Sequence, residues 1–153
     1  FIVWGFLGMI FVIIFKLFSS GVAIAQQVHL LPSIQNSVFF AGLLTAFMTS
    51  FFMNVFFAPT FMLFHRVTDN YIELGQGNLK QISRVKLKDV IHHIDFDHFI
   101  YFVVLKTIPL FWIPAHTITF LLPENYRVLM AAYLSVVLGV LLSVAKNKKP
   151  KVD

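Results

Sequence analysis

The chain has 153 residues, of which 58% are hydrophobic and 12% carry a charge, whereas charged residues make up about 25% of an ordinary soluble domain. This composition indicates a membrane protein and, because each crossing needs about 20 residues, excludes a separate soluble domain of ordinary size. The net charge of +5 comes from Lys and Arg beside apolar segments, which fits orientation in a bilayer and argues against nucleic-acid binding. The absence of cysteine excludes disulfides, thiolate metal ligands and a cysteine nucleophile.

Four apolar stretches predict an all-α membrane protein, a single transmembrane domain of four helices. They cover residues 1–18, about 38–64, 98–122 and 126–145. The first lacks a basic leading segment and a small-residue cleavage site, so we interpret it as a span and not as a signal peptide. The second is long for one crossing, and we expect it to tilt or to kink at Pro59.

A polar, basic loop, residues 65–97, separates the second span from the third. Within it, "VKLKDVIHHIDF" has apolar residues near helical spacing, which predicts a short amphipathic helix at the membrane surface before the third span. Five Lys or Arg lie in this loop and four in the tail 146–153, whereas residues 19–37 contain none. The positive-inside rule therefore places both termini on the cytoplasmic or matrix side. The membrane would be the plasma membrane of a bacterium or an organellar membrane of a eukaryote.

The polar side chains at membrane depth include Asn54, Lys106 and His116. A lysine near the bilayer centre costs about 2.5 kcal/mol or more, so it should face the bundle interior or water. These residues could line a pore or polar seam. The alternative for Lys106 is that its long stem returns the ammonium group to the basic side.

Where the second span leaves the membrane, Arg66 and Asp69 lie three positions apart. Such a pair can lock one helix to another or line the inner mouth of a polar pathway. It can also be a solvated salt bridge worth well under 1 kcal/mol. The spacing leaves both interpretations open.

The stretch "HHIDFDH" could supply ligands for a divalent metal ion, because helical spacing brings His93 near Asp97 and His92 near Asp95. The alternative is a set of interfacial residues, in which the two aspartates stabilise the N-terminus of the third span. The candidate ligands are His92, His93, Asp95, Asp97 and His98. No catalytic motif supports an enzyme, and we predict no cofactor.

Two groups of residues resemble motifs of the Mpv-seventeen and peroxisomal membrane protein twenty-two family. That family has Gly-Pro in a span, then an aromatic pair, a basic residue and an Asp ten positions after the Pro. The matching positions here are Ala58, Pro59, Phe64, His65, Arg66 and Asp69. The family's C-terminal motif corresponds to Trp112, Pro114, Phe120, Pro123, Tyr126 and Arg127, with Ile113 inserted and Thr119 in place of Asn. Asp97-His98 stands where the family has Asp-Gln.

The resemblance covers roughly residues 55–146 and implies a four-helix membrane protein that acts as a poorly selective channel or small-solute pathway. It also implies a helix-entry motif at Pro123, Tyr126 and Arg127, and it makes Asp97 a partner for Arg66 at the inner mouth. We therefore expect a channel for small solutes or ions, in contact with the lipid bilayer. The alternatives are a non-catalytic subunit of a homo-oligomer or larger membrane complex and, third, a metal-dependent membrane enzyme.

Overall fold

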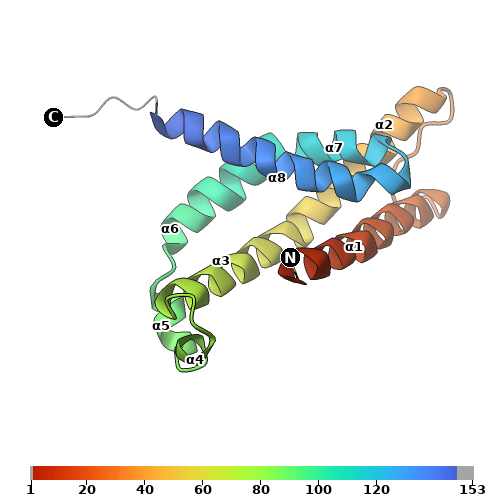
Figure 1. Ribbon diagram of the computed structural model, residues 1–153. Helices are drawn as coiled ribbons and strands as arrows, with labels where there is room; N and C mark the ends of the chain where they lie inside the picture. Colours follow the sequence, from red (N-terminus) through yellow and green to blue (C-terminus); the bar gives the residue numbers. More distant parts are fainter. Residues whose placement is uncertain (1, 148–153) are drawn as a thin grey trace. The chain divides into compact units, whose positions relative to one another are not determined.

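The computed structural model describes residues 2–147, and within them the chain forms helices and no strand (Figure 1). The elements in chain order are α1 (Ile2–Gln27), α2 (Val38–Phe56), α3 (Ala58–Leu74), α4 (Leu79–Ile82), α5 (Leu87–His92), α6 (Phe96–His98), the π-helix η1 (Phe99–Trp112), α7 (Ile113–Leu121) and α8 (Glu124–Asn147). The all-α fold class is confirmed, including a short helix, α5, before the third span.

Four helical segments in the described part of the chain are long and apolar enough to cross a bilayer. They are Gly8–Gln27, Val38–Phe56, Phe96–Leu121 and Glu124–Leu141. Their lengths of 18 to 26 residues are sufficient for the roughly 20 residues that a hydrocarbon core requires. The protein is therefore an integral membrane protein of the multi-pass type.

Helix α1 continues past Phe18 to Gln27, because residues 19–27 contain no proline and end in the good helix formers Ala25, Gln26 and Gln27. It ends where His29 adopts a left-handed backbone, with φ at 59°. The amide of Leu30 then donates to the carbonyl of Ala25 at 2.8 Å, as in a Schellman motif. The Gln26 side chain donates to the carbonyl of Pro32 at 2.9 Å and fixes the turn that follows.

The second apolar stretch is divided at Phe57, between α2 and α3. Pro59 lies in the first turn of α3, where its missing N–H removes no bond that the new helix needs. Helix α3 then runs on to Leu74, beyond the apolar stretch, and carries the polar sequence that follows His65. The third span is not one regular α-helix. It consists of α6, the π-helix η1 and α7 in succession, and Pro109 lies inside η1.

The chain forms two compact units, which we call the terminal unit (residues up to 50 and from 115 onward) and the central unit (residues 51–114). In the terminal unit, α1 contacts α8. Thr45 of α2 donates its hydroxyl hydrogen to the Gln26 amide oxygen of α1 at 2.8 Å. The buried apolar side chains of this unit include Phe15, Val22, Ala46, Ala131 and Leu134.

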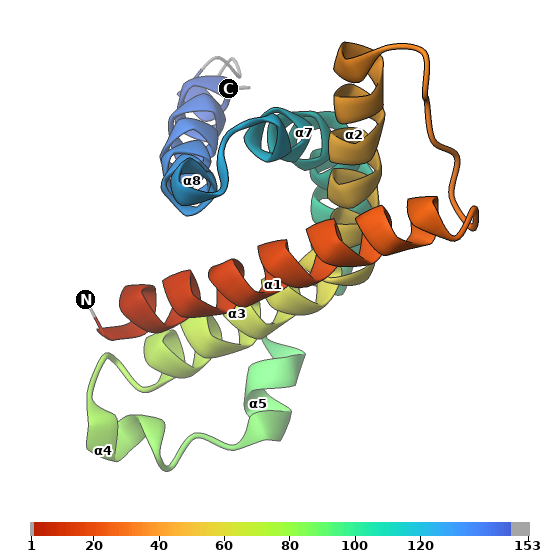
Figure 2. The same ribbon diagram turned by 90° about the vertical axis from the view of Figure 1, so that its right-hand side faces the viewer.

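In the central unit, α4 and α5 pack against α3 (Figure 2). Val90 and Ile94 are buried, while Asn78 caps α4 by accepting from the amide of Lys80 at 3.0 Å. Gly75 permits the close approach of α4 to the end of α3. A Cβ atom at this position would lie 2.8 Å from both N and Cα of Ile82.

We predict that Gly75→Ala lowers the free energy of unfolding by about 1–3 kcal/mol, the usual cost of overpacking, because the Ile82 backbone has no flexible end to move aside. The matched control is Gly42→Ala in α2, where an added Cβ meets nothing within 4 Å. Thermal unfolding in one detergent mixture measures both. Equal midpoints for Gly75→Ala and the unsubstituted protein would contradict the close contact.

Candidate functional site

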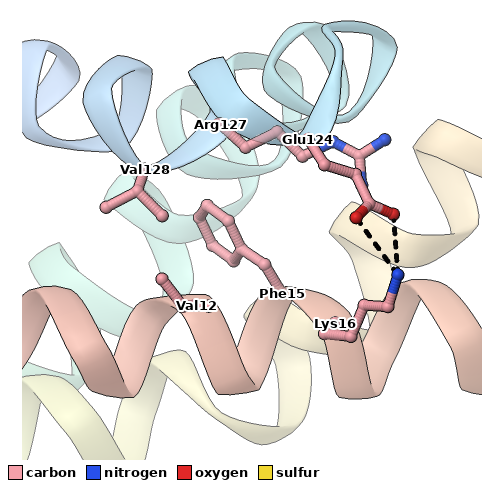
Figure 3. Close-up of a pocket in the computed structure, with 6 residues that line it drawn as sticks. All are labelled: Val12, Phe15, Lys16, Glu124, Arg127 and Val128. Carbon is pink, nitrogen blue, oxygen red and sulfur yellow. Dashed lines mark hydrogen bonds and ion pairs between the residues drawn. The ribbon is translucent and has the colours of Figure 1, made fainter.

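The candidate site lies in the terminal unit and begins with a charged side chain inside the first span. Lys16 occupies the middle of α1 in an otherwise uncharged helix. Its Nζ lies 2.9 Å from Oε1 and 3.1 Å from Oε2 of Glu124 (Figure 3). Glu124 is the first residue of α8, where the helix dipole stabilises a carboxylate. The ion pair thus connects two spans through charges that would each be costly alone in lipid.

Arg127 lies three residues after Glu124 on α8 and stabilises the connection between α7 and α8. Its Nε donates to the carbonyl of Leu122 at 3.0 Å and its Nη2 to the carbonyl of Phe120 at 3.2 Å. The guanidinium carbon lies 5.5 Å from the centre of the Phe120 ring. A cation at the C-terminal end of α7 satisfies carbonyls that the helix leaves open.

Pro123 and Tyr126, the other residues of the helix-entry motif, lie at the same turn. Pro123 immediately precedes α8, and its carbonyl accepts from the amide of Tyr126 at 3.0 Å. The Tyr126 side chain is exposed. Of the three motif residues, Arg127 therefore makes the tertiary contacts described here.

Between α1 and α8 lies an open pocket of about 120 Å³ (Figure 3). Its apolar wall is formed by Val12, Phe15 and Val128, and its charged wall by Lys16, Glu124 and Arg127. The volume is enough for several water molecules. Two cations and one carboxylate leave the pocket with one net positive charge, which favours anions.

Phe15 lines this pocket and also contacts a buried histidine. Its ring is 3% exposed and meets His116 edge-on, with ring centres 5.9 Å apart. Its ring centre also lies 5.1 Å from that of Phe120. His116, which the sequence predicted to face the bundle interior, is 6% exposed. The pocket, the Phe15 ring and the His116 imidazole therefore lie next to one another within the terminal unit.

Asn54 and Lys106, the other residues of the predicted seam, belong to the central unit. Asn54 is fully buried. Lys106 is exposed, and its Nζ lies 5.9 Å from the centre of the Phe102 ring, one turn nearer to the start of the span. That direction is the one expected for a lysine that returns its charge to the basic side.

The residues predicted at the inner mouth also belong to the central unit. Asp69 pairs with His65, whose Nδ1 lies 2.8 Å from its Oδ2. Arg66 and Asp97 are exposed. Among residues 2–147, the ion pairs seen are Lys16–Glu124 and His65–Asp69, so neither carboxylate is paired with Arg66.

The stretch "HHIDFDH" is organised by local contacts. Oδ1 of Asp95 accepts from the amide of His98 at 2.9 Å and caps α6. The His98 ring stacks on Phe102 with centres 5.0 Å apart, and the side chains of His92, His93 and Asp97 are exposed. In the described residues, no group of three or more His, Asp or Glu side chains is placed to hold a metal ion, whereas a zinc site needs at least three protein ligands.

No protein-family model, curated protein or solved structure matches the chain. The candidate site therefore rests on its own geometry. Lys16 is the residue that the sequence analysis overlooked. The criterion that selected Lys106, an ionisable side chain within an apolar stretch, applies equally to Lys16, and Glu124 is the acidic residue at the start of α8.

We predict that Lys16→Glu destabilises the protein, because it opposes two carboxylates between α1 and α8, and that adding Glu124→Lys restores part of the loss. Recovery should be incomplete, since the swap places a cation at the N-terminus of α8. Thermal unfolding in lipid nanodiscs measures the series. Glu73→Lys, at an exposed carboxylate of α3, serves as the control second substitution. If it rescues Lys16→Glu as well as Glu124→Lys does, the pairing is refuted.

Proposed function

We propose that the protein provides a pathway of low selectivity for small solutes or ions, and that the pocket between α1 and α8 is its outer entrance. The observation that carries this proposal is the pocket with its charged wall, one of whose lining residues, Phe15, contacts the buried His116. An enzyme has no comparable support, because the site contains no nucleophile activated by a base.

The orientation inferred from the basic segments decides the side toward which the pocket would open. If the loop 65–97 and the tail 146–153 lie on the cytoplasmic or matrix side, the end of α1 and the start of α8 lie on the opposite side. The 2.9 Å contact between Lys16 and Glu124 brings the middle of α1 next to the start of α8. The pocket then opens toward the outer side.

The charges of the pocket favour anions over cations. Lys16 and Glu124 neutralise each other, and Arg127 adds a further positive charge. A positive entrance raises the local concentration of anions. The resemblance to the Mpv-seventeen family implies the same class of function, a small-solute pathway, and supports the proposal at that level.

We predict that liposomes containing the purified protein admit chloride faster than empty liposomes, as read by an entrapped halide-sensitive dye. Phe15→Ala should increase the rate severalfold by removing the ring between the pocket and His116, and Val12→Phe should lower it by filling the pocket. Phe64→Ala, at an exposed aromatic of α3, is the matched control. Absence of flux by the unsubstituted protein, or equal rates for Phe15→Ala and Phe64→Ala, would reject the proposal.

A second candidate is a non-conducting subunit of a larger assembly, favoured by the small buried fraction of the spans. Only 11% of the first and fourth spans and 28% of the second are buried within the chain, and Phe39, Phe40 and Phe56 of α2 are exposed. Co-purification of a stoichiometric partner, together with loss of the protein when it is expressed alone, would support this candidate. A stable monomer in nanodiscs would exclude it.

A further inference from the structure

The segment from Asn78 to His92, which holds α4 and α5, presents an exposed surface that none of the functions above uses. We call it the basic platform. Its cations are Lys80, Arg84, Lys86 and Lys88, all exposed, and its exposed apolar side chains are Leu79, Leu87 and Ile91. We propose that the basic platform lies in the headgroup layer of the inner leaflet and binds anionic phospholipids.

The first argument is the distance of the platform from the bilayer. Helix α5 ends at His92, and the membrane-crossing segment begins at Phe96. The linker of residues 93–95 can reach about 10 Å when fully extended. The headgroup region adds about 5–7 Å on each side of the hydrocarbon core, so α5 stays in or next to it.

The second argument is that the platform is folded and holds its charges in place. Val90 is fully buried and Ile94 is 6% exposed, and both α4 and α5 contact α3. The glycine contact between Gly75 and Ile82 and the Asn78 cap fix the start of the segment. Its cations are therefore presented from a packed surface and not from a loose loop.

The third argument is charge. Asp89 is the one acidic residue between Asn78 and His92, against four cations. Among the described residues, the ion pairs of the chain involve none of these four cations. Unpaired Lys and Arg close to a membrane surface are attracted by anionic lipid headgroups.

The fourth argument is the exposed apolar side chains among the cations. Leu79 is 82% exposed, and Leu87 and Ile91 lie one helical turn apart on α5 at 54% and 42%. Side chains four positions apart share one face of a helix. Leucine and isoleucine beside lysine are typical of helices that rest in the interface with the apolar side chains inserted and the cations among headgroups. A water-facing or nucleic-acid-binding surface has no use for this apolar stripe.

The test compares lipids by charge on the full-length protein. Native mass spectrometry of the protein in micelles, titrated with phosphatidylglycerol or phosphatidylcholine, should show preferential retention of phosphatidylglycerol. The combined substitution Lys80→Gln, Arg84→Gln, Lys86→Gln and Lys88→Gln should remove that preference, with a loss of at least about tenfold in apparent affinity, as expected when four surface cations are neutralised. The matched control exchanges Lys and Arg at the same four positions, which keeps the charge and should keep the preference.

Insertion is tested separately, and the absence of cysteine from the chain makes single labelling simple. An environment-sensitive dye at Leu79→Cys should be quenched by lipids that carry a spin label on the upper acyl chain, below the headgroup, and more strongly in vesicles containing phosphatidylglycerol. The same dye at Ser83→Cys, on an exposed polar position beyond α4, is the control.

Equal retention of both lipids, or a glutamine variant that keeps the preference, would overturn the inference. So would equal quenching at both labelled positions. An oligonucleotide that displaces phosphatidylglycerol and binds more tightly would identify a nucleic-acid surface instead and refute lipid binding. None of these readouts depends on solute flux, so the inference can fail or hold independently of the proposed pathway.

Discussion

The contact between Lys16 and Glu124 resolves an energetic conflict on which the terminal unit depends. A lysine in the middle of an apolar helix is costly in lipid unless a partner or water compensates its charge. Glu124 provides the partner from the start of α8, and the dipole of that helix stabilises the carboxylate. Arg127 is one turn away, but its Nε and Nη2 are engaged by the carbonyls at the end of α7. The Lys16–Glu124 contact thus joins two spans, whereas the Arg127 contacts stabilise the turn between α7 and α8.

The sequence predicts the number and type of the crossing segments well, because lipid imposes length and apolarity on every crossing helix. It predicts their ends less well. Residues 19–27 carry no charge and look like a connection, yet they continue α1 until His29 takes a left-handed backbone. Helix α3 likewise continues through His65 and Asp69, since those two side chains pair one turn apart. Local helix stabilisation overrides hydropathy in both cases.

The functional residues were harder to predict, because pairing between distant elements is invisible in composition. Lys106 and Lys16 look alike in sequence, but only Lys16 pairs with a carboxylate on another span, while Lys106 lies over Phe102 on its own helix. The stretch "HHIDFDH" shows the reverse difficulty. Its many ligand-type side chains suggest a metal site in the sequence. In the structure, Asp95 caps α6 and His98 stacks on Phe102.

The polar side chains of the spans therefore fall into two physical classes. The hydroxyls of Thr49 and Thr119 each donate to a carbonyl four residues earlier in their own helix, so they tolerate burial without water. The charged side chains of the pocket have no such local solution, because an ammonium, a guanidinium and a carboxylate need partners or solvent. A buried threonine is consequently poor evidence for a polar route through a helix bundle. An ion pair that joins two spans beside an open pocket is better evidence. Burying unpaired charges costs free energy, which favours both the pairing and a position next to water.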